Sequence, residues 1–198
     1  MKEPQTENNA LWKQRYRVCG LWQATLARQT RSRGLVSSTV SGTGQIYAWD
    51  LSSGALRQLT SSAGGIFSGY ISPDGRYVFY LRDAEGSETG HYVRIPWDGG
   101  AEQDLTPQMP PYAALYRCVV SDDGALFAFA PAEAQGFPLY CLGLHADGSV
   151  GAPRELYRSP KFIDDASLSA NGELVVVATT ERSPARQYSL LAFETGSG

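Results

Sequence analysis

Cysteine is scarce in this sequence, and its spacing suits neither disulfides nor metals. Only Cys19, Cys118 and Cys141 occur among 198 residues, and no two of them form a C-x-x-C pair. An odd, widely spaced set predicts neither a disulfide framework nor a zinc site. We therefore expect buried or partly buried thiols in a reducing compartment.

Long apolar runs are also missing. No window approaches the roughly 18 consecutive apolar residues that identify a membrane-spanning helix. Residues 1–20 contain no apolar stretch of the kind that a secretory signal carries. The sequence thus predicts a cytoplasmic protein that does not associate with a membrane.

An excess of positive charge is absent as well. The formal net charge is -3, which argues against a nucleic-acid partner, because such proteins usually carry a basic domain. The charge is uneven, since residues 1–33 contain seven basic and two acidic side chains. We expect residues 1–18 to form a polar arm. Its basic side chains would contact either an anionic partner or, as we favour, an acidic surface of the protein itself.

Turn-forming residues, by contrast, are plentiful, with 21 Gly and 11 Pro. The stretch Tyr70–Thr106 shows how they are used. Short apolar runs there alternate with Ser72-Pro73-Asp74-Gly75, with a polar loop, and with Asp98-Gly99-Gly100. Aromatic and β-branched runs separated by Asp-Gly predict β-hairpins. We expect four short strands that form one antiparallel meander.

The pattern of this stretch repeats along the chain. Its first turn recurs as Ser121-Asp122-Asp123-Gly124 and as Ser169-Ala170-Asn171-Gly172, at spacings of 49 and 48 residues. A period of about 40–50 residues with four strands per unit is typical of propeller blades. The predicted fold is an all-β partial propeller of about four four-stranded antiparallel blades, the last one incomplete. After the arm, the predicted propeller covers residues 19–198, with blades at about 20–60, 64–107, 110–159 and 161–198.

The strand after each repeated turn is the most apolar of its unit. These strands contain Tyr77–Leu81, Leu126–Phe129 and Leu174–Val177. A strand that is covered on both faces loses alternation and forms a continuous apolar run. We expect these strands to lie between neighbouring blades, and the last, mostly polar strand of each unit to form the outer edge.

The run from Ile46 to Thr106 resembles the amino-terminal propeller of the prolyl oligopeptidase family of serine peptidases, nearest its acylaminoacyl-peptidase and dipeptidyl-peptidase-like branch. The resemblance rests on Ile46–Asp50, Arg57–Thr60, Ser72–Val78, Pro96–Gly100 and Asp104–Thr106. It implies a cytoplasmic enzyme in which the blades limit the short peptides that reach an α/β-hydrolase domain. That domain is the implied partner and peptides are the implied substrates. No catalytic residue carries over to this chain, so the resemblance implies a part that is not catalytic alone.

No nucleophile motif is convincing in the sequence itself. Gly65-Ile66-Phe67-Ser68-Gly69 places Ser68 one position away from the frame of G-x-S-x-G. Only two histidines occur, His91 and His145. A triad of one of them with Ser121 and Asp122 would need residues that the repeated turn already explains. We predict no catalytic residue.

Metal and phosphate sites are equally weak. Asp164 and Asp165 could act as paired carboxylates, but adjacent residues of a strand point to opposite faces. Gly42-Thr43-Gly44 resembles the start of a phosphate loop, yet no helix pattern follows, so it predicts a hairpin turn. We predict no metal and no cofactor.

Two functions remain open at this stage. One is the substrate-gating propeller of a serine peptidase. The other is a free-standing propeller of the TolB or WD40 kind that binds proteins as a scaffold. A four-bladed ring could close if a strand from residues 11–19 completed the last blade.

Overall fold

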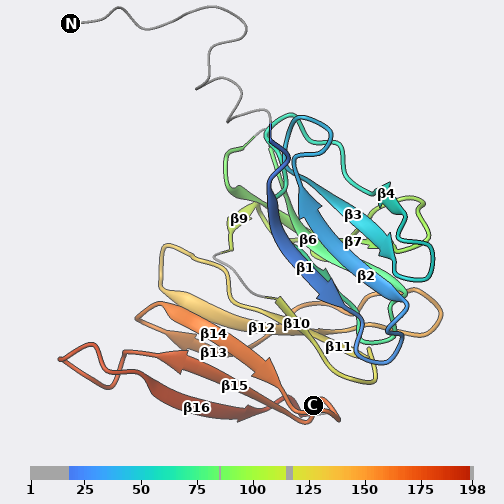
Figure 1. The fold of residues 1–198 in the computed structure, drawn as a ribbon. Coiled ribbons are helices and arrows are strands. Elements are labelled where there is room, and N and C mark those ends of the chain that lie inside the picture. The colour runs from blue at the N-terminus through green and yellow to red at the C-terminus, as the bar shows by residue number, and fades with distance from the viewer. Residues whose placement is uncertain (1–17, 85, 115–117, 197–198) are drawn as a thin grey trace, which may run out of the picture.

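The structure, a computed structural model, describes residues 18–84, 86–114 and 118–196. Strands and turns make up this part of the chain, and no helix occurs in it. The strands form four antiparallel sheets that follow one another along an arc (Figure 1). Each sheet is a propeller blade, and the prediction of an all-β partial propeller is confirmed.

The first two blades each contain four strands in simple meander order, and one further short strand is added to the second blade. Blade 1 consists of β1 (Leu21–Leu26), β2 (Arg33–Ser38), β3 (Gln45–Asp50) and β4 (Leu56–Gln58). Blade 2 consists of β5 (Tyr70–Ile71), β6 (Tyr77–Asp83), β7 (Thr89–Pro96) and β8 (Gln103–Asp104). The short strand β9 (Tyr112–Ala113), which the sequence placed in the third unit, pairs with β7 of blade 2.

Blades 3 and 4 differ in strand number. Blade 3 consists of β10 (Cys118–Val120), β11 (Leu126–Phe129), β12 (Phe137–Gly143) and β13 (Arg154–Ser159). Blade 4 has three strands, β14 (Ile163–Leu168), β15 (Leu174–Thr179) and β16 (Ser189–Glu194). The last blade therefore lacks an outer strand within the described part of the chain, as the sequence predicted. Of residues 11–19, which could complete it, 11–17 lie outside the described residues, and Val18 and Cys19 belong to no strand.

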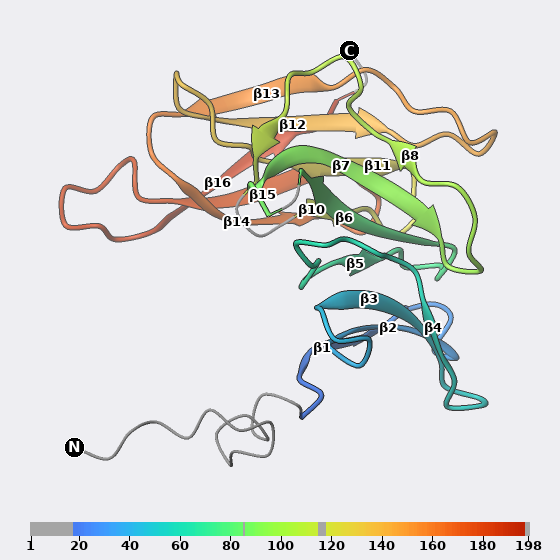
Figure 2. The ribbon, with the colours of Figure 1, turned by 90° about the horizontal axis from the view of Figure 1, so that it is seen from above.

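The cores lie between the blades, because each sheet has two apolar faces that water would otherwise contact. Adjacent residues of β6 belong to different cores: Val78 and Tyr80 pack toward blade 1, and Phe79 packs toward blade 3. All three are at most 1% exposed. Figure 2 shows the sheets side by side in this order. The expectation that this strand is covered on both faces is confirmed.

The same expectation is wrong for β15. Val175 and Val177 are buried against blade 3, whereas Leu174 is 42% exposed. Burial alternates along the strand because blade 4 has a neighbour on one face only. The apolar run Leu174–Val177 is thus not evidence that both faces of the strand are covered.

The repeated turns have one geometry. Gly75, Gly124 and Gly172 have φ angles of 74°, 73° and 72°, a region that glycine adopts at no steric cost. In each turn the serine hydroxyl accepts a hydrogen bond from the backbone N–H five residues later, at 2.9 Å. The same hydroxyl donates to the Asp or Asn side chain two residues later. The turn is therefore specified locally.

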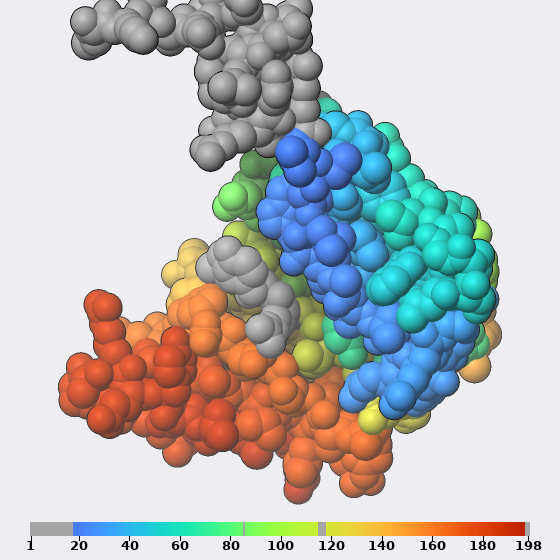
Figure 3. Space-filling model, viewed as in Figure 1, coloured from blue at the N-terminus to red at the C-terminus, as the bar shows by residue number. Residues whose placement is uncertain are grey.

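The turns that join the first two strands of each blade meet one another, and we call this meeting point the turn hub. It contains Gln29, Pro73, Asp122 and Ala170. The backbone N–H of Gln29, in the β1–β2 turn, donates to Pro73 O at 2.9 Å, and its side-chain amide donates to Asp122 O at 2.6 Å. The Asp122 N–H donates to Ala170 O at 3.2 Å. Blade 1 thus contacts blade 3 directly at the hub. Away from it, blades 1 and 4 diverge (Figure 3).

Candidate functional site

The serine and aspartate of the conceivable triad are turn residues. Ser121 Oγ donates to Asp123 Oδ1 at 2.5 Å and accepts from the Leu126 N–H. Asp122 forms an ion pair with Arg28 of blade 1. Neither side chain hydrogen-bonds to His91 or His145 among the described contacts, so the structure does not assemble this triad.

His91 has a different acid partner, which the sequence did not indicate. Its Nδ1 lies 2.8 Å from Asp104 Oδ2, across the β7–β8 pair. The imidazole stacks on Tyr112 with ring centroids 5.7 Å apart, and Nε2 is buried without a hydrogen-bond partner. Because no hydroxyl or thiol in the described part of the chain bonds to Nε2, the pair lacks a nucleophile. A strand register, not a motif, brings these two residues together.

The other sequence candidates occupy structural positions. Ser68 is exposed in the loop before β5, and Gly42-Thr43-Gly44 lies in the β2–β3 hairpin, where Gly42 has a φ of 98°. Asp164 and Asp165 belong to β14, next to a shift in its pairing with β15. In the part of the chain that the structure describes, no group of three His, Cys, Asp or Glu side chains could hold a metal ion.

The cysteines are free thiols, two of them buried. Cys118 and Cys141 lie in the blade cores, and Cys19 is exposed. Burial raises the pKa of Cys118 to about 12, which keeps it in the thiol form at neutral pH. The sequence-based expectation of buried thiols is confirmed for Cys118 and Cys141.

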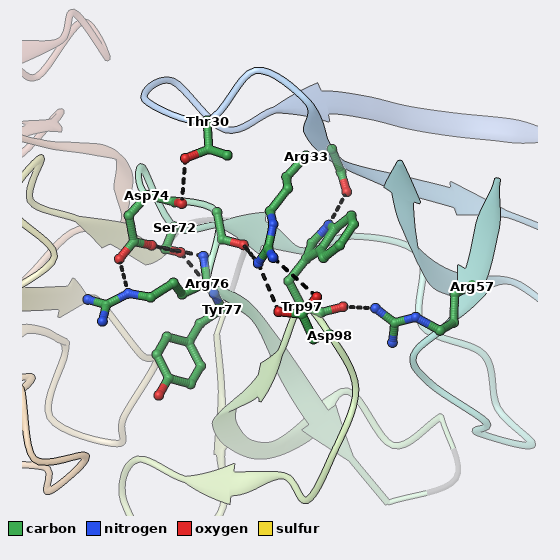
Figure 4. Close-up of polar contacts among 11 residues, drawn as sticks. Thr30, Arg33, Arg57, Ser72, Asp74, Arg76, Tyr77, Trp97 and Asp98 are labelled. Carbon is green, nitrogen blue, oxygen red and sulfur yellow. Dashed lines mark hydrogen bonds and ion pairs between the residues drawn. The ribbon is translucent and has the colours of Figure 1, made fainter. Parts of the chain in front are cut away.

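A cationic and aromatic joint connects blades 1 and 2 (Figure 4). Trp97 is 8% exposed, and its Nε1–H donates to Gly34 O at 2.8 Å. The guanidinium carbons of Arg33 and Arg57 lie 4.4 and 5.5 Å from the centroid of the Trp97 ring. Arg33 also pairs with Asp98, and Arg57 donates to Trp97 O. A buried indole with two cations above it fixes the angle between the blades.

A polar cavity of about 160 Å³ lies between blades 2 and 3, behind the turn hub. Its wall includes Asp74, Arg76 and Tyr77 from blade 2, part of which Figure 4 shows, together with Asp123 and His145 from blade 3. Arg94 of β7 also lines it and is only 4% exposed. This cavity therefore places a buried charge beside open space.

The carboxyl of Asp74 in this wall is held by its own turn. Burial alone would raise its pKa, but hydrogen bonds from Ser72 Oγ, from the Arg76 N–H and from the Arg76 guanidinium outweigh burial and lower it. The Arg76 guanidinium also forms an ion pair with Asp74. Asp74 is therefore ionised and engaged at neutral pH.

Exposed apolar side chains gather on the two terminal blades. Within the described ranges, no large apolar side chain of residues 68–173 is exposed. Blade 1 and its loops expose Leu21, Trp22 and Phe67, and the two aromatic rings meet edge to face at 5.3 Å. Blade 4 exposes Leu174 and Leu190, the latter by 74%. The terminal faces thus resemble the internal ones in composition but have no covering blade.

Comparison with known proteins places this arc among propellers. No protein-family model matches the chain, and no curated protein sequence matches it. Among solved structures, it is similar to TolB from Acinetobacter baumannii, with a TM-score of 0.64 and 18% identity over 90% of this chain and 42% of that one. It is also similar to a prolyl endopeptidase, with a TM-score of 0.65 and 12% identity over 92% of this chain and 29% of that one.

A third similar structure is the propeller domain of the Trilobed protease from Pyrococcus furiosus, with a TM-score of 0.62 and 13% identity. The likeness extends over 91% of this chain and 56% of that domain. The chain therefore spans less than two thirds of each of these proteins. At such identities the likeness shows the fold alone, which propellers of peptidases and TolB-like proteins share. The branch that the sequence favoured stays a prediction.

Proposed function

We propose that this chain is the substrate-gating propeller of a cytoplasmic serine peptidase of the prolyl oligopeptidase family. In this proposal the blades limit the size of the peptides that reach an α/β-hydrolase domain, and they perform no chemistry themselves. The sequence run from Ile46 to Thr106 supports the family. The fold likeness to a prolyl endopeptidase and to the Trilobed protease is consistent with it.

The observation that carries the gating role is the difference between the two ends of the blade arc. At the turn hub, Gln29 and Arg28 of blade 1 are bound to Asp122 of blade 3, which brings blades 1 and 3 into contact at that end. At the other end, blades 1 and 4 diverge (Figure 3). A propeller of this shape would admit peptides from one end only and would exclude folded proteins by size.

The proposal is tested with a fluorophosphonate probe, which reacts covalently with activated serines. The protein that carries these residues is tagged in its native cells, captured, and treated with the probe. We expect a labelled serine hydrolase, either as the tagged polypeptide itself or as a co-captured chain. A preparation in which neither is labelled, although a known serine hydrolase in the same extract is labelled, contradicts the proposal.

Two variants sharpen this capture experiment. Leu190→Arg places a charge on the exposed face of blade 4 and should abolish capture of a separate hydrolase chain, because apolar interfaces do not bury unpaired charges. Arg31→Gln changes an exposed side chain of the β1–β2 turn and serves as the matched control. Equal capture by both variants would place the hydrolase in the same polypeptide or on another surface.

The second candidate is a protein-binding scaffold, which the likeness to TolB favours. A scaffold predicts stable capture of a folded partner and no probe-reactive serine in either chain. Labelling therefore separates the two functions.

A further inference from the structure

Arg94 is a buried cation without a neighbouring anion. Its Nε donates to Gln103 Oε1 at 2.7 Å, and its Nη2 donates to Gly148 O at 2.7 Å. Both acceptors are neutral. Within the described residues, Arg94 forms no ion pair and Nη1 has no hydrogen-bond acceptor, although a guanidinium carries five N–H donors.

The electrostatic surroundings of this guanidinium favour an incoming anion. Burial lowers the pKa of Arg94, Tyr77 offsets part of this, and the positive charge of Arg76 lowers the pKa further. The ring of Tyr77 lies 4.5 Å from the guanidinium carbon and offers only its π face. A buried charge normally has a paired partner, because its desolvation is costly. Here no carboxylate of the described residues takes that place, and Arg94 borders the cavity.

The carboxylates of the cavity wall do not serve as the partner. Asp74 is bound to Ser72 and Arg76 of its own turn. Asp123 uses Oδ1 for Ser121 Oγ and for the Ala125 N–H. Both acids are thus held by the turns that contain them, and neither lies within ion-pair distance of Arg94.

We propose that the cavity between blades 2 and 3 binds a small carboxylate, with the Arg94 guanidinium as its principal ligand. The planar guanidinium matches the two oxygens of a carboxylate in geometry and charge. A monoanion fits better than a phosphate dianion, because the charges of Arg76 and Arg94 are already balanced by Asp74 and Asp123 in the wall, and a monoanion adds less uncompensated charge. The site does not depend on the peptidase proposal, since all the residues that line it belong to blades 2 and 3 and their loops.

The carboxylate could come from a free acid or from the C-terminus of a peptide, and the probes separate these sources. Acetate represents the free acid, and N-acetylglycine represents the peptide end. N-acetylglycinamide, which has no charge, is the control for the peptide group. Inorganic phosphate is the competing anion, and sodium chloride keeps the ionic strength constant.

The experiment is NMR of the arginine side chains in the intact protein during titration with each probe. We expect saturable shifts of the Arg94 Nε–H signal with acetate or N-acetylglycine, and none with N-acetylglycinamide. Arg158 is an internal reference, because its guanidinium is held by Glu133 and Glu155 at 2.8 and 2.5 Å. Tighter binding of phosphate than of both carboxylates would overturn the assignment to carboxylates.

Variants test the location. Ala125→Trp fills the cavity from an exposed position and retains Arg94. It should raise the dissociation constant of the carboxylate about tenfold or more, which is the effect of losing a charge-assisted hydrogen bond. Arg94→Gln should do the same where it folds, and Arg31→Gln should leave binding unchanged. An unmoved Arg94 signal with every carboxylate, or native affinity in Ala125→Trp, overturns the site.

Discussion

Blades 2 and 4 contain the same local structure in different surroundings. The turn of blade 2 is Ser72–Gly75 and that of blade 4 is Ser169–Gly172, with the same hydrogen bonds and nearly the same glycine φ angle. Yet Ser72 is 3% exposed, whereas Ser169 is half-buried. The turn therefore forms from its own residues, whether or not a neighbouring blade covers it.

The strands that follow these turns show the opposite behaviour. In β6, Val78, Phe79 and Tyr80 are all buried, since blades 1 and 3 cover both faces. In β15, only alternate side chains are buried. Similar apolar runs thus have different burial, because burial depends on neighbours and not on the run itself. The stability of the protein should accordingly lie in its internal blades.

The largest test of this difference truncates one apolar side chain in each region. Phe79→Ala should lower the free energy of unfolding by about 3–5 kcal/mol, because Phe79 is 1% exposed and stacks on Phe127 at 5.5 Å. Leu190→Ala should change it by less than about 0.5 kcal/mol, because Leu190 is 74% exposed. Urea unfolding followed by tryptophan fluorescence measures both.

The more conservative Phe79→Leu provides the control for a variant that fails to fold. It should cost less than about 1.5 kcal/mol, in line with other exchanges between apolar side chains of similar size. If Leu190→Ala proves as costly as Phe79→Ala, the exposed face of blade 4 is covered in solution.

A smaller effect is expected at the joint between blades 1 and 2. Trp97→Phe removes the donor to Gly34 O and weakens the contacts with Arg33 and Arg57, so it should cost about 1–3 kcal/mol. Trp22→Phe is the matched control, since Trp22 is 55% exposed and makes an aromatic contact with Phe67. We expect it to cost about 0.5 kcal/mol or less. The same unfolding measurement applies, and equal costs would mean that the joint does not hold the blades together.

The smallest expected effect is a loss of stability in acid, and it should differ between the turns of blades 2 and 4. Hydrogen bonds and the Arg76 charge keep the pKa of folded Asp74 below its ordinary value of 3.8, despite burial. The stability that this depression contributes is present above the unfolded pKa and is lost as the pH falls below about 4 through the folded value. Blade 4 has the amide Asn171 at this position and has no such dependence.

Asp74→Asn should therefore flatten the loss of stability below about pH 4, with a cost of roughly 1 kcal/mol at neutral pH. The measurement is the urea midpoint at pH 7 and at pH 3. Asp164→Asn, at an exposed strand position, should keep the native pH profile. An unchanged profile in Asp74→Asn would assign the acid sensitivity to other carboxylates.

Several features of the fold were predictable because they depend on adjacent residues. The spacing of Ser72, Ser121 and Ser169 predicted the blades, and the sequence after Leu174 predicted that the fourth blade is incomplete. The sequence also indicated that Ser121 is no catalytic nucleophile, because it fits the repeated turn. The α/β-hydrolase partner, the peptide substrates and the cytoplasmic location stay proposals.

The candidate sites were not predictable in the same way. Nothing in the sequence around Arg94 sets it apart from a surface arginine, and the register of β7 with β8, the Tyr77 ring and the approach of Gly148 bury it. The same holds for His91 with Asp104 and for Gln29 with Asp122. No spacing in the sequence relates these residues, because the contacts form across sheets and between blades.

The sequence alone determined the repeated turns, the apolar strands that follow them and the division into four blades, since φ preferences, hydrogen bonds within a turn and apolar runs act over a few residues. The tertiary structure decided which faces are covered, where the turn hub closes, and that the Arg94 charge faces a cavity. These features depend on the packing of one blade against the next, because burial raises the free-energy cost of a charged side chain that has no partner.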